Sequence, residues 1–408
     1  MIIRKIKPEE IKRTDELFSI AFECPSDNEK SAMELYEDML NDPSSRHNKY
    51  WMERYAAFED DDKTMMSYFS ARPLPVHYDG NHCQMTGIGG VATLPQYRRR
   101  GAIRGCFEKS LKDMYENVYE FSYLYPFSTA YYRKFGYELC CEKLNYKLNL
   151  AFLPVYPVNG SCELAEPSDT HLADVREIHR IWQNTYNMMV ENEDCDYLWL
   201  TRTNPVKEQE FTYIYKDVNK TPKGYLTFKN ENTAEGRVMQ CSRFVYTDLE
   251  GFKGLINLAK SFSSDHMFFI FSLPVDQYIA PLLPEWSMGA ADCKLLQCGM
   301  ARVVHVEKVL KKARYLGSGE IRIAVTDPYI EENNQTFHVC FNNGTAYSVS
   351  KNNDTADITL NISDFSRLII GCLHTEQITF LENVIVNTDL DTLRKVFYKK
   401  PVMITEYF

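Results

Sequence analysis

The chain has 408 residues, more than one hydrophobic core usually organises, so we expect two or three domains. Its 44% hydrophobic and 25% charged residues are typical of a globular protein and disfavour a disordered one. A net charge of −10 disfavours nucleic acid as a partner, because an acidic surface repels the phosphate backbone.

The N-terminus is charged from Arg4 onward and lacks the apolar core of a signal peptide, which favours a cytoplasmic protein. The most apolar later stretch, 266–284, contains Asp276 and prolines, so we predict a buried strand and loop rather than a membrane span. The 12 cysteines are scattered without a Cys-x-x-Cys pair, which favours reduced thiols. No metal is predicted, because the nine histidines show no metal-binding spacing.

Strand and helix patterns alternate over the first 150 residues and predict a mixed sheet flanked by helices. Asp79 and Gly80 mark a tight turn between two of its strands. The predicted strands are 2–6, 50–58, 64–72, 82–95, 121–125 and 137–148, and the predicted helices are 8–22, 29–40, 102–115 and 128–134.

Prolines, Asn159 and Gly160 interrupt the periodic pattern at 154–161, which predicts a domain boundary. The following region repeats the earlier order in weaker form, with strands at 224–229, 238–246 and 267–273 and a helix at 249–262. From about residue 298 the pattern becomes rich in strands, at 300–307, 321–327, 335–341, 344–350 and 356–361, and ends with helices at 364–373 and 389–397.

The most informative segment is Gln96-Tyr97-Arg98-Arg99-Arg100-Gly101, between an apolar strand and an amphipathic helix. A helix N-terminus has unpaired amides and a partial positive charge, so a tight turn into a helix is an anion site. Gly101 permits the turn, and the three arginines supply forked donors that suit a diphosphate. The alternative is that these arginines are only solvated surface charge.

The segment from Val91 to Ile103 resembles the acetyl-CoA motif of the GNAT superfamily, Q/R-x-x-G-x-G/A. Arg98 and Gly101 match the motif, whereas Ile103 replaces its last small residue. The resemblance extends to the Eis (enhanced intracellular survival) family of N-acetyltransferases, whose members share an Arg-Arg-Arg-Gly loop with a bulky residue at that position. It covers essentially the whole chain.

The resemblance implies an α+β protein with two GNAT-like mixed-sheet domains, the second degenerate, and a sterol-carrier-protein-like α+β domain. We place these domains at 1–153, 154–296 and 297–408. It also implies acetyl-CoA as co-substrate, a primary amine as acceptor and a hexameric assembly. Aminoglycosides, polyamines and lysine side chains are all open as acceptors.

The resemblance also assigns roles to residues of the acetyl-CoA site. The backbone of Val91, Ala92 and Thr93 would pair with the pantetheine arm, and Phe127 and Ser128 would flank the thioester. The phosphates would be held by the loop and the first turn of the helix, that is by Arg98, Arg99, Arg100, Gly101, Ala102, Ile103 and Arg104.

The acid and base also come from the resemblance. The segment from Tyr132 to Tyr137 is similar to the family's Tyr-x-x-Phe-Gly-Tyr segment, whose first tyrosine is the proton donor, and Tyr131 beside it is the obvious false match. The base would be the terminal carboxylate of Phe408. The tail 402–408 is apolar and strand-prone, so it can be ordered and buried.

Carboxylates and an aromatic wall would receive a cationic acceptor, and we name Glu23, Asp27, Glu406 and Phe22 as candidates. Two other classes of function stay open: a non-catalytic module that binds acyl-CoA or lipid, and a structural assembly protein.

Overall fold

The computed structural model describes the whole chain except residues 26–28, 43–52, 167, 198–199, 201–203 and 408. The chain forms two compact units. The first unit combines Met1–Cys141 with Cys298–Phe408, and the second is Glu142–Gln297. The three domain ranges remain predictions, and strand β12 (Ala291–Val303) crosses the boundary placed after residue 296.

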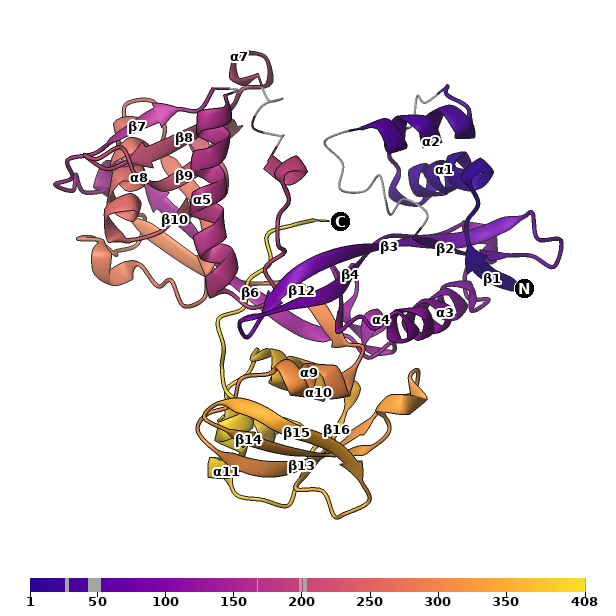
Figure 1. Cartoon of the computed structure of the whole chain (residues 1–408). Helices are drawn as coiled ribbons and strands as arrows, with labels where there is room; N and C mark the ends of the chain where they lie inside the picture. The colour runs from indigo at the N-terminus through magenta and orange to yellow at the C-terminus, as the bar shows by residue number, and fades with distance from the viewer. Residues whose placement is uncertain (26–28, 43–52, 167, 198–199, 201–203, 408) are drawn as a thin grey trace. The chain divides into compact units, whose positions relative to one another are not determined.

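The first unit contains a mixed sheet with strand order β1, β2, β3, β4, β5, β12 (Figure 1). β4 and β5 are parallel, and the other neighbouring pairs in this row are antiparallel. The predicted turn closes the hairpin of β3 and β4, with positive φ at Asp79 (49°) and Gly80 (83°). The strands before β12 are β1 Ile2–Lys5, β2 Arg54–Phe58, β3 Met65–Tyr78, β4 Asn81–Thr93 and β5 Phe121–Leu124.

Helices cover both faces of this sheet, because alternate side chains of each strand point to opposite faces. Helix α3 (Ala102–Glu116) packs on one face, where the rings of Phe107 and Phe69 lie 4.8 Å apart. Helices α1 (Ile11–Phe22) and α2 (Ala32–Asn41) lie on the other face, and Leu17 shares a core there with Phe58. The helix-flanked mixed sheet predicted for this region is confirmed, except that the strand predicted at 137–148 is β6 (Glu138–Asn149), which pairs with β11 of the second unit.

The second unit repeats the arrangement, with strand order β7, β8, β9, β10, β11, β6. β10 and β11 are parallel, and helix α8 (Leu249–Ser261) connects them, as α3 connects β4 and β5. Helix α5 (Asp169–Thr185) follows β7, in the place of α1. The weaker repeat is confirmed; its strands are β7 Ser161–Leu164, β8 Glu210–Lys216, β9 Pro222–Thr233, β10 Gly236–Tyr246, β11 Phe268–Pro274 and β6 Glu138–Asn149.

Each of these sheets is completed by a strand from a distant part of the sequence. Met300–Val303 of β12 pairs antiparallel with β5 in the first unit, and β6 pairs antiparallel with β11 in the second. The strand predicted at 300–307 is therefore wrong in its end and its place: it ends at Val303, belongs to the N-terminal sheet and is followed by helix α9 (Val306–Lys312).

The C-terminal part of the first unit has its own sheet, ordered β15, β14, β13, β16, β17. The four strands predicted between 321 and 361 are confirmed, and so are the two closing helices. Arg302 of β12 is fully buried, and its guanidinium lies 2.6 Å from the Asp327 carboxylate just after β13. The elements are β13 Gly319–Thr326, β14 Thr336–Asn342, β15 Thr345–Asn352, β16 Ile358–Asn361, β17 Ile385–Val386, α10 Ile362–Ile370 and α11 Leu390–Val396.

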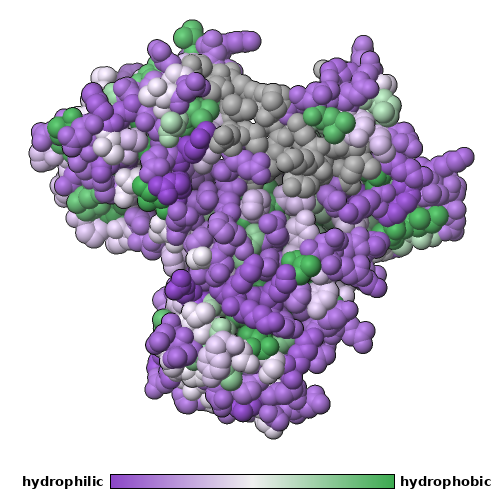
Figure 2. All heavy atoms as spheres, viewed as in Figure 1, coloured by the Kyte–Doolittle hydropathy of each residue, from purple (hydrophilic) through white to green (hydrophobic). Residues whose placement is uncertain are grey.

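On the face shown in Figure 2, hydrophilic residues predominate and hydrophobic ones are scattered among them. Within the described residues, no helix combines the length and the hydropathy that crossing a membrane requires.

Candidate functional site

The parallel strands β4 and β5 separate at one end. Their pairing runs from Met85 opposite Phe121 to Ile88 opposite Leu124, where β5 ends. Over its last residues β4 pairs only with β3 among the described residues, and a bulge at Gly90, with φ of 61°, interrupts that pairing. The other backbone edge of 89–93 is therefore available to a slender ligand.

Helix α3 begins just beyond this strand, and no side chain caps its N-terminus. Gly101 is the N-cap residue, and its φ of 83° requires a residue that tolerates left-handed backbone. The amide of Gly105 donates to the carbonyl of Gly101, so the amides before it have no partner within the helix. Amides without a partner at the positive end of a helix dipole favour an anion, so the geometry is compatible with the predicted anion site.

Three arginines around this N-terminus have no competing partner. Arg98, Arg99 and Arg104 are exposed, and their guanidinium groups make no hydrogen bond or ion pair with any described residue. Arg100 differs: it stacks over the ring of Tyr97 at 5.2 Å and lies 3.9 Å from the Glu59 carboxylate. The unpaired arginines thus concentrate positive charge at the helix end.

A cavity of about 660 Å³ lies where these features meet. Of the predicted acetyl-CoA residues, Ala92, Arg100 and Ser128 do not line it. Those that do are Val91, Thr93, Arg98, Arg99, Gly101, Ala102, Ile103, Arg104 and Phe127. Five further lining residues were not predicted from the sequence: Ala21, Tyr97, Tyr131, Lys134 and Phe135.

Ile103, the departure from the GNAT motif, borders the cavity without occupying much of it. Its side chain is 7% exposed and belongs to the same core as Phe107 and Leu111. Most of its bulk is therefore accommodated inside the domain, and the backbone of the first helical turn stays accessible.

Tyr131 and Tyr132 occupy helix α4 (Thr129–Arg133), which Ser128 caps by accepting a hydrogen bond from the Tyr131 amide. The Tyr132 ring is 2% exposed, with its centroid 5.4 Å from that of Phe127 and 6.1 Å from that of Phe107. Its hydroxyl has no hydrogen-bond partner among the described residues, and burial raises its pKa above the usual value.

Tyr131, rather than Tyr132, lines the cavity. Burial raises the pKa of Tyr131, while the charge of Arg104 opposes that rise. Both phenols are therefore protonated at neutral pH.

The C-terminal tail returns to the end of β5. Its residues 402–404 are buried. Tyr125, the first residue after β5, donates a hydrogen bond of 2.7 Å to the backbone carbonyl of Glu406, and its ring stacks on Tyr407 with centroids 4.4 Å apart. The expectation of a buried tail is met at residues 402–404, whereas Thr405 and Tyr407 are exposed and Phe408 lies outside the described residues.

A buried ion pair anchors the start of this tail. The Lys400 ammonium lies 2.5 Å from the carboxylate of Asp79 in the hairpin of β3 and β4, and both side chains are almost fully buried. The same carboxylate accepts a hydrogen bond of 2.7 Å from the Arg314 amide. Burial lowers the pKa of Lys400, and the Asp79 charge opposes this effect.

The residues proposed to receive an amine do not all meet at the cavity. Phe22 lines it and stacks on Phe18, with centroids 4.5 Å apart. Glu23 follows at the end of α1 and is exposed, but it does not line the cavity, and neither does Glu406. Asp27 lies outside the described residues.

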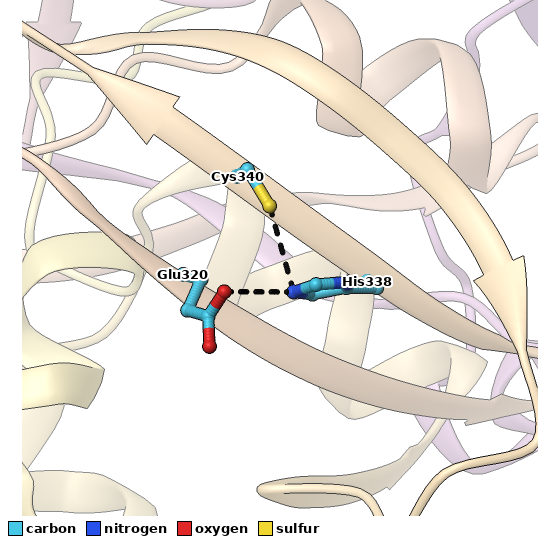
Figure 3. A group of neighbouring side chains, drawn as sticks. All are labelled: Glu320, His338 and Cys340. Carbon is cyan, nitrogen blue, oxygen red and sulfur yellow. Dashed lines mark hydrogen bonds and ion pairs between the residues drawn. The ribbon is translucent and has the colours of Figure 1, made fainter.

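One group of described residues could hold a metal ion, on the sheet of the C-terminal part (Figure 3). Glu320 on β13 and His338 and Cys340 on β14 place their ligand atoms within 4.8 Å of one another. His338 Nε2 lies 3.1 Å from the Glu320 carboxylate, which is also 3.7 Å from the guanidinium of Arg322. The Glu320 carboxylate therefore already has a cationic neighbour in Arg322.

Two domain families match the chain. Residues 2–140 match an acetyltransferase (GNAT) domain, and residues 306–405 match a sterol carrier protein domain. The N-terminal region is a GNAT acetyltransferase domain. No curated protein matches the sequence. The site described above thus lies in the GNAT domain, at the splayed ends of its parallel strands.

Solved structures share the fold over the whole chain. A probable N-acyltransferase from Enterococcus faecalis V583 is 22% identical with a TM-score of 0.81, over 100% of this chain and 99% of the other. A GCN5-related N-acetyltransferase from Anabaena variabilis is 19% identical with a TM-score of 0.84, over 100% of both chains. Eis1 from Mycobacterium abscessus is 16% identical with a TM-score of 0.78, also over 100% of both chains.

The expected resemblance to the Eis family is confirmed at the level of fold and domain content. A GNAT domain precedes a sterol carrier protein domain, and Eis1 has the same overall fold. The α+β fold class is confirmed with it.

Proposed function

We propose that the protein is an acetyl-CoA-dependent N-acetyltransferase that moves the acetyl group to a primary amine. The observation that carries the proposal is the cavity at the uncapped N-terminus of α3, where Arg98, Arg99 and Arg104 have no partner among the described residues. Coenzyme A carries a diphosphate and a ribose phosphate, which match free amides and forked cationic donors.

The residues present fit a long, slender thioester. Its phosphates would lie on the first turn of α3, and its amide-containing arm would pair with the backbone edge of Val91–Thr93. Phe127 is 72% exposed and lines the same cavity, so it can contact the acetyl end. Ser128 would act indirectly, by capping α4 and so holding the tyrosines in place.

The reaction needs a neutral amine, an acid and a base. The amine nitrogen attacks the thioester carbonyl carbon, a C–N bond forms and the C–S bond breaks. The departing thiolate takes the proton of the Tyr132 hydroxyl, and the terminal carboxylate of Phe408 takes a proton from the amine. Burial keeps Tyr132 protonated, so that it can donate at any physiological pH.

Tyr132→Phe tests the acid. We expect kcat to fall by about a hundredfold to ten-thousandfold, because the thiolate then leaves without a proton donor. The Kd for acetyl-CoA, measured by calorimetry, should stay within about twofold of the wild-type value, since the ring is retained. Thiol release with a panel of aminoglycosides, polyamines and lysine derivatives gives the rate and the acceptor class together.

Tyr131→Phe is the matched control, because it removes the neighbouring hydroxyl from a residue that lines the cavity. Its kcat should remain close to that of the wild type. If instead Tyr131→Phe is inactive and Tyr132→Phe is active, the assignment of the acid is wrong. If no amine releases thiol and acetyl-CoA does not bind, the proposed function itself fails.

Deleting Phe408 tests the base, because the deletion moves the terminal carboxylate back by one residue. We expect kcat to fall by roughly a hundredfold or more, with an unchanged melting temperature. Phe408→Leu keeps the carboxylate in place and should retain most of the activity. Full activity after the deletion would show that the tail only packs against Tyr125.

The assembly and the location of the protein stay predictions from the resemblance. A hexamer would be measured directly by light scattering of the purified full chain. Cytoplasmic localisation would be measured by fractionation of cells that express it.

A further inference from the structure

The second unit contains a cavity in the place that corresponds to the acetyl-CoA site of the first. It lies where the parallel strands β10 and β11 end and helix α8 begins, and its volume is about 350 Å³, within the range of small-molecule sites. The equivalent position in the GNAT domain is the end of β4 and β5 at the start of α3. Each copy of the fold therefore has a cavity where its two parallel strands end and the connecting helix begins.

This second cavity cannot hold a diphosphate in the same way. Asp248 caps α8, accepting a hydrogen bond of 2.9 Å from the Gly251 amide, so a carboxylate occupies the anion position. The lining contains no lysine, arginine or histidine. The electrostatics at this helix N-terminus are therefore opposite to those around α3.

The lining instead includes five aromatic rings and one carboxylate that has no cationic partner among the described residues. Trp182, Tyr186, Tyr246, Phe252 and Tyr278 all face the cavity. Asp248 is neutralised by the ammonium of Lys223 at 2.9 Å, whereas no described cation pairs with the second carboxylate, that of Asp276. Aromatic faces together with an unpaired carboxylate favour a cationic ligand.

A hydrogen-bond network holds these groups in place before any ligand binds. The Trp182 indole donates to the Tyr246 carbonyl at 2.7 Å, and the Tyr246 hydroxyl donates to Gln277 at 2.8 Å. The Gln277 amide in turn donates to the Tyr186 hydroxyl at 3.1 Å, and both groups donate to Oδ2 of Asp276 at 3.3 Å. Oδ1 of Asp276 accepts no hydrogen bond from the described residues, so it is available to a ligand.

We propose that the cavity at the ends of β10 and β11 binds a small organic cation, with Asp276 as counter-ion and Trp182, Tyr246 and Tyr278 as aromatic walls. The ligand class is a protonated or quaternary ammonium compound small enough for the cavity. The proposal does not depend on acetyl transfer, because none of these residues belongs to the GNAT domain.

Calorimetry of the full chain with choline, and with its neutral isostere in which carbon replaces the nitrogen, tests the charge requirement. We expect choline to bind and the isostere to bind at least about fivefold more weakly, since only the cation interacts with Asp276 and the ring faces. Equal binding of the two probes, or no binding of choline, would overturn the proposal.

Choline binding by the variants Asp276→Asn and Tyr278→Leu tests whether the ligand lies in this cavity. Asp276→Asn should weaken choline binding by about fivefold. Tyr278 is 58% exposed, so its replacement by leucine should leave folding intact and weaken choline binding by about threefold. Asp169→Asn, at the start of α5, makes the same charge change outside the cavity and should leave choline binding unchanged.

Acetyl-CoA binding, measured on the same variants, should be unchanged. Choline binding that survives both substitutions would overturn the proposal. Failure of acetyl-CoA to bind any variant or the wild type would instead bear on the proposed transferase function.

Discussion

The N-termini of α3 and α8 occupy equivalent places in two copies of one fold, yet their chemistry is opposite. The N-cap residue of α3 is Gly101, which has no side chain to cap the helix, and Arg98, Arg99 and Arg104 around it are unpaired within the described residues. α8 starts at Asp248, whose carboxylate caps the helix and pairs with Lys223. The backbone therefore forms a cavity at this position in both copies. The N-cap residue and its neighbours determine whether the cavity favours an anionic or a cationic ligand.

Gly101→Asp should break the comparison most strongly, because it places a carboxylate at the N-terminus of α3, where α8 has one. A carboxylate there would repel the diphosphate, so the Kd for acetyl-CoA should rise by about a thousandfold. Gly101→Asn is the control: it has nearly the same shape, tolerates positive φ and carries no charge. If both variants lose the same affinity, shape rather than charge decides binding at this turn.

The free energy of unfolding of the second unit should depend on pH through a buried histidine. His179 in α5 is 7% exposed, and burial lowers its pKa from 6.5 to about 4. The unfolded chain therefore binds more protons between these values. The second unit should keep its full stability above about pH 6.5 and lose about 3 kcal/mol as the pH falls through that range to about 4.

Urea unfolding followed by tryptophan fluorescence measures this effect, since three of the four tryptophans belong to the second unit by sequence. His179→Gln should make the free energy of unfolding nearly independent of pH across the window. An unchanged slope in that variant would assign the acid sensitivity to other groups.

Asp248→Ala has the smallest expected effect. It removes the cap of α8 and should lower the free energy of unfolding of the second unit by about 1 kcal/mol. Asp248→Asn keeps a capping side chain and removes only the ion pair with Lys223, so its stability should be close to that of the wild type. A large loss in Asp248→Asn would show that the ion pair, rather than the cap, stabilises this end of α8.

Local sequence signals predicted the features that depend on neighbouring residues. Asp79 and Gly80 favour a tight turn, and Gly101 favours the turn that ends the loop from Tyr97. The second copy was predicted from the periodic pattern of its strands and its helix. The uncapped N-terminus of α3 also follows from a local signal, because the glycine at its N-cap has no side chain. The roles of Tyr132 and Phe408 came only from the family resemblance, and they remain predictions.

Features that depend on distant pairing were missed. The apolar run beginning at Met300 indicates a strand, but nothing local shows that it pairs with Phe121–Leu124 rather than with the later sheet. Likewise, three successive arginines look equivalent in the sequence, and only the position of Tyr97 and Glu59 turns Arg100 away from the cavity. Tyr131 lines the cavity because of the direction in which α4 packs, which a motif match does not contain.

The pairing of Met300–Val303 with β5, which is far earlier in the sequence, also affects how the protein is synthesised and folds. While the nascent chain leaves the ribosome, β5 has an open edge until the entire second unit and then Met300–Val303 have been synthesised. The tail that Tyr125 contacts is translated later than Met300–Val303. A chain that stalls before Met300 therefore exposes the backbone edge of β5, which can pair with a strand of another chain until Met300–Val303 covers it.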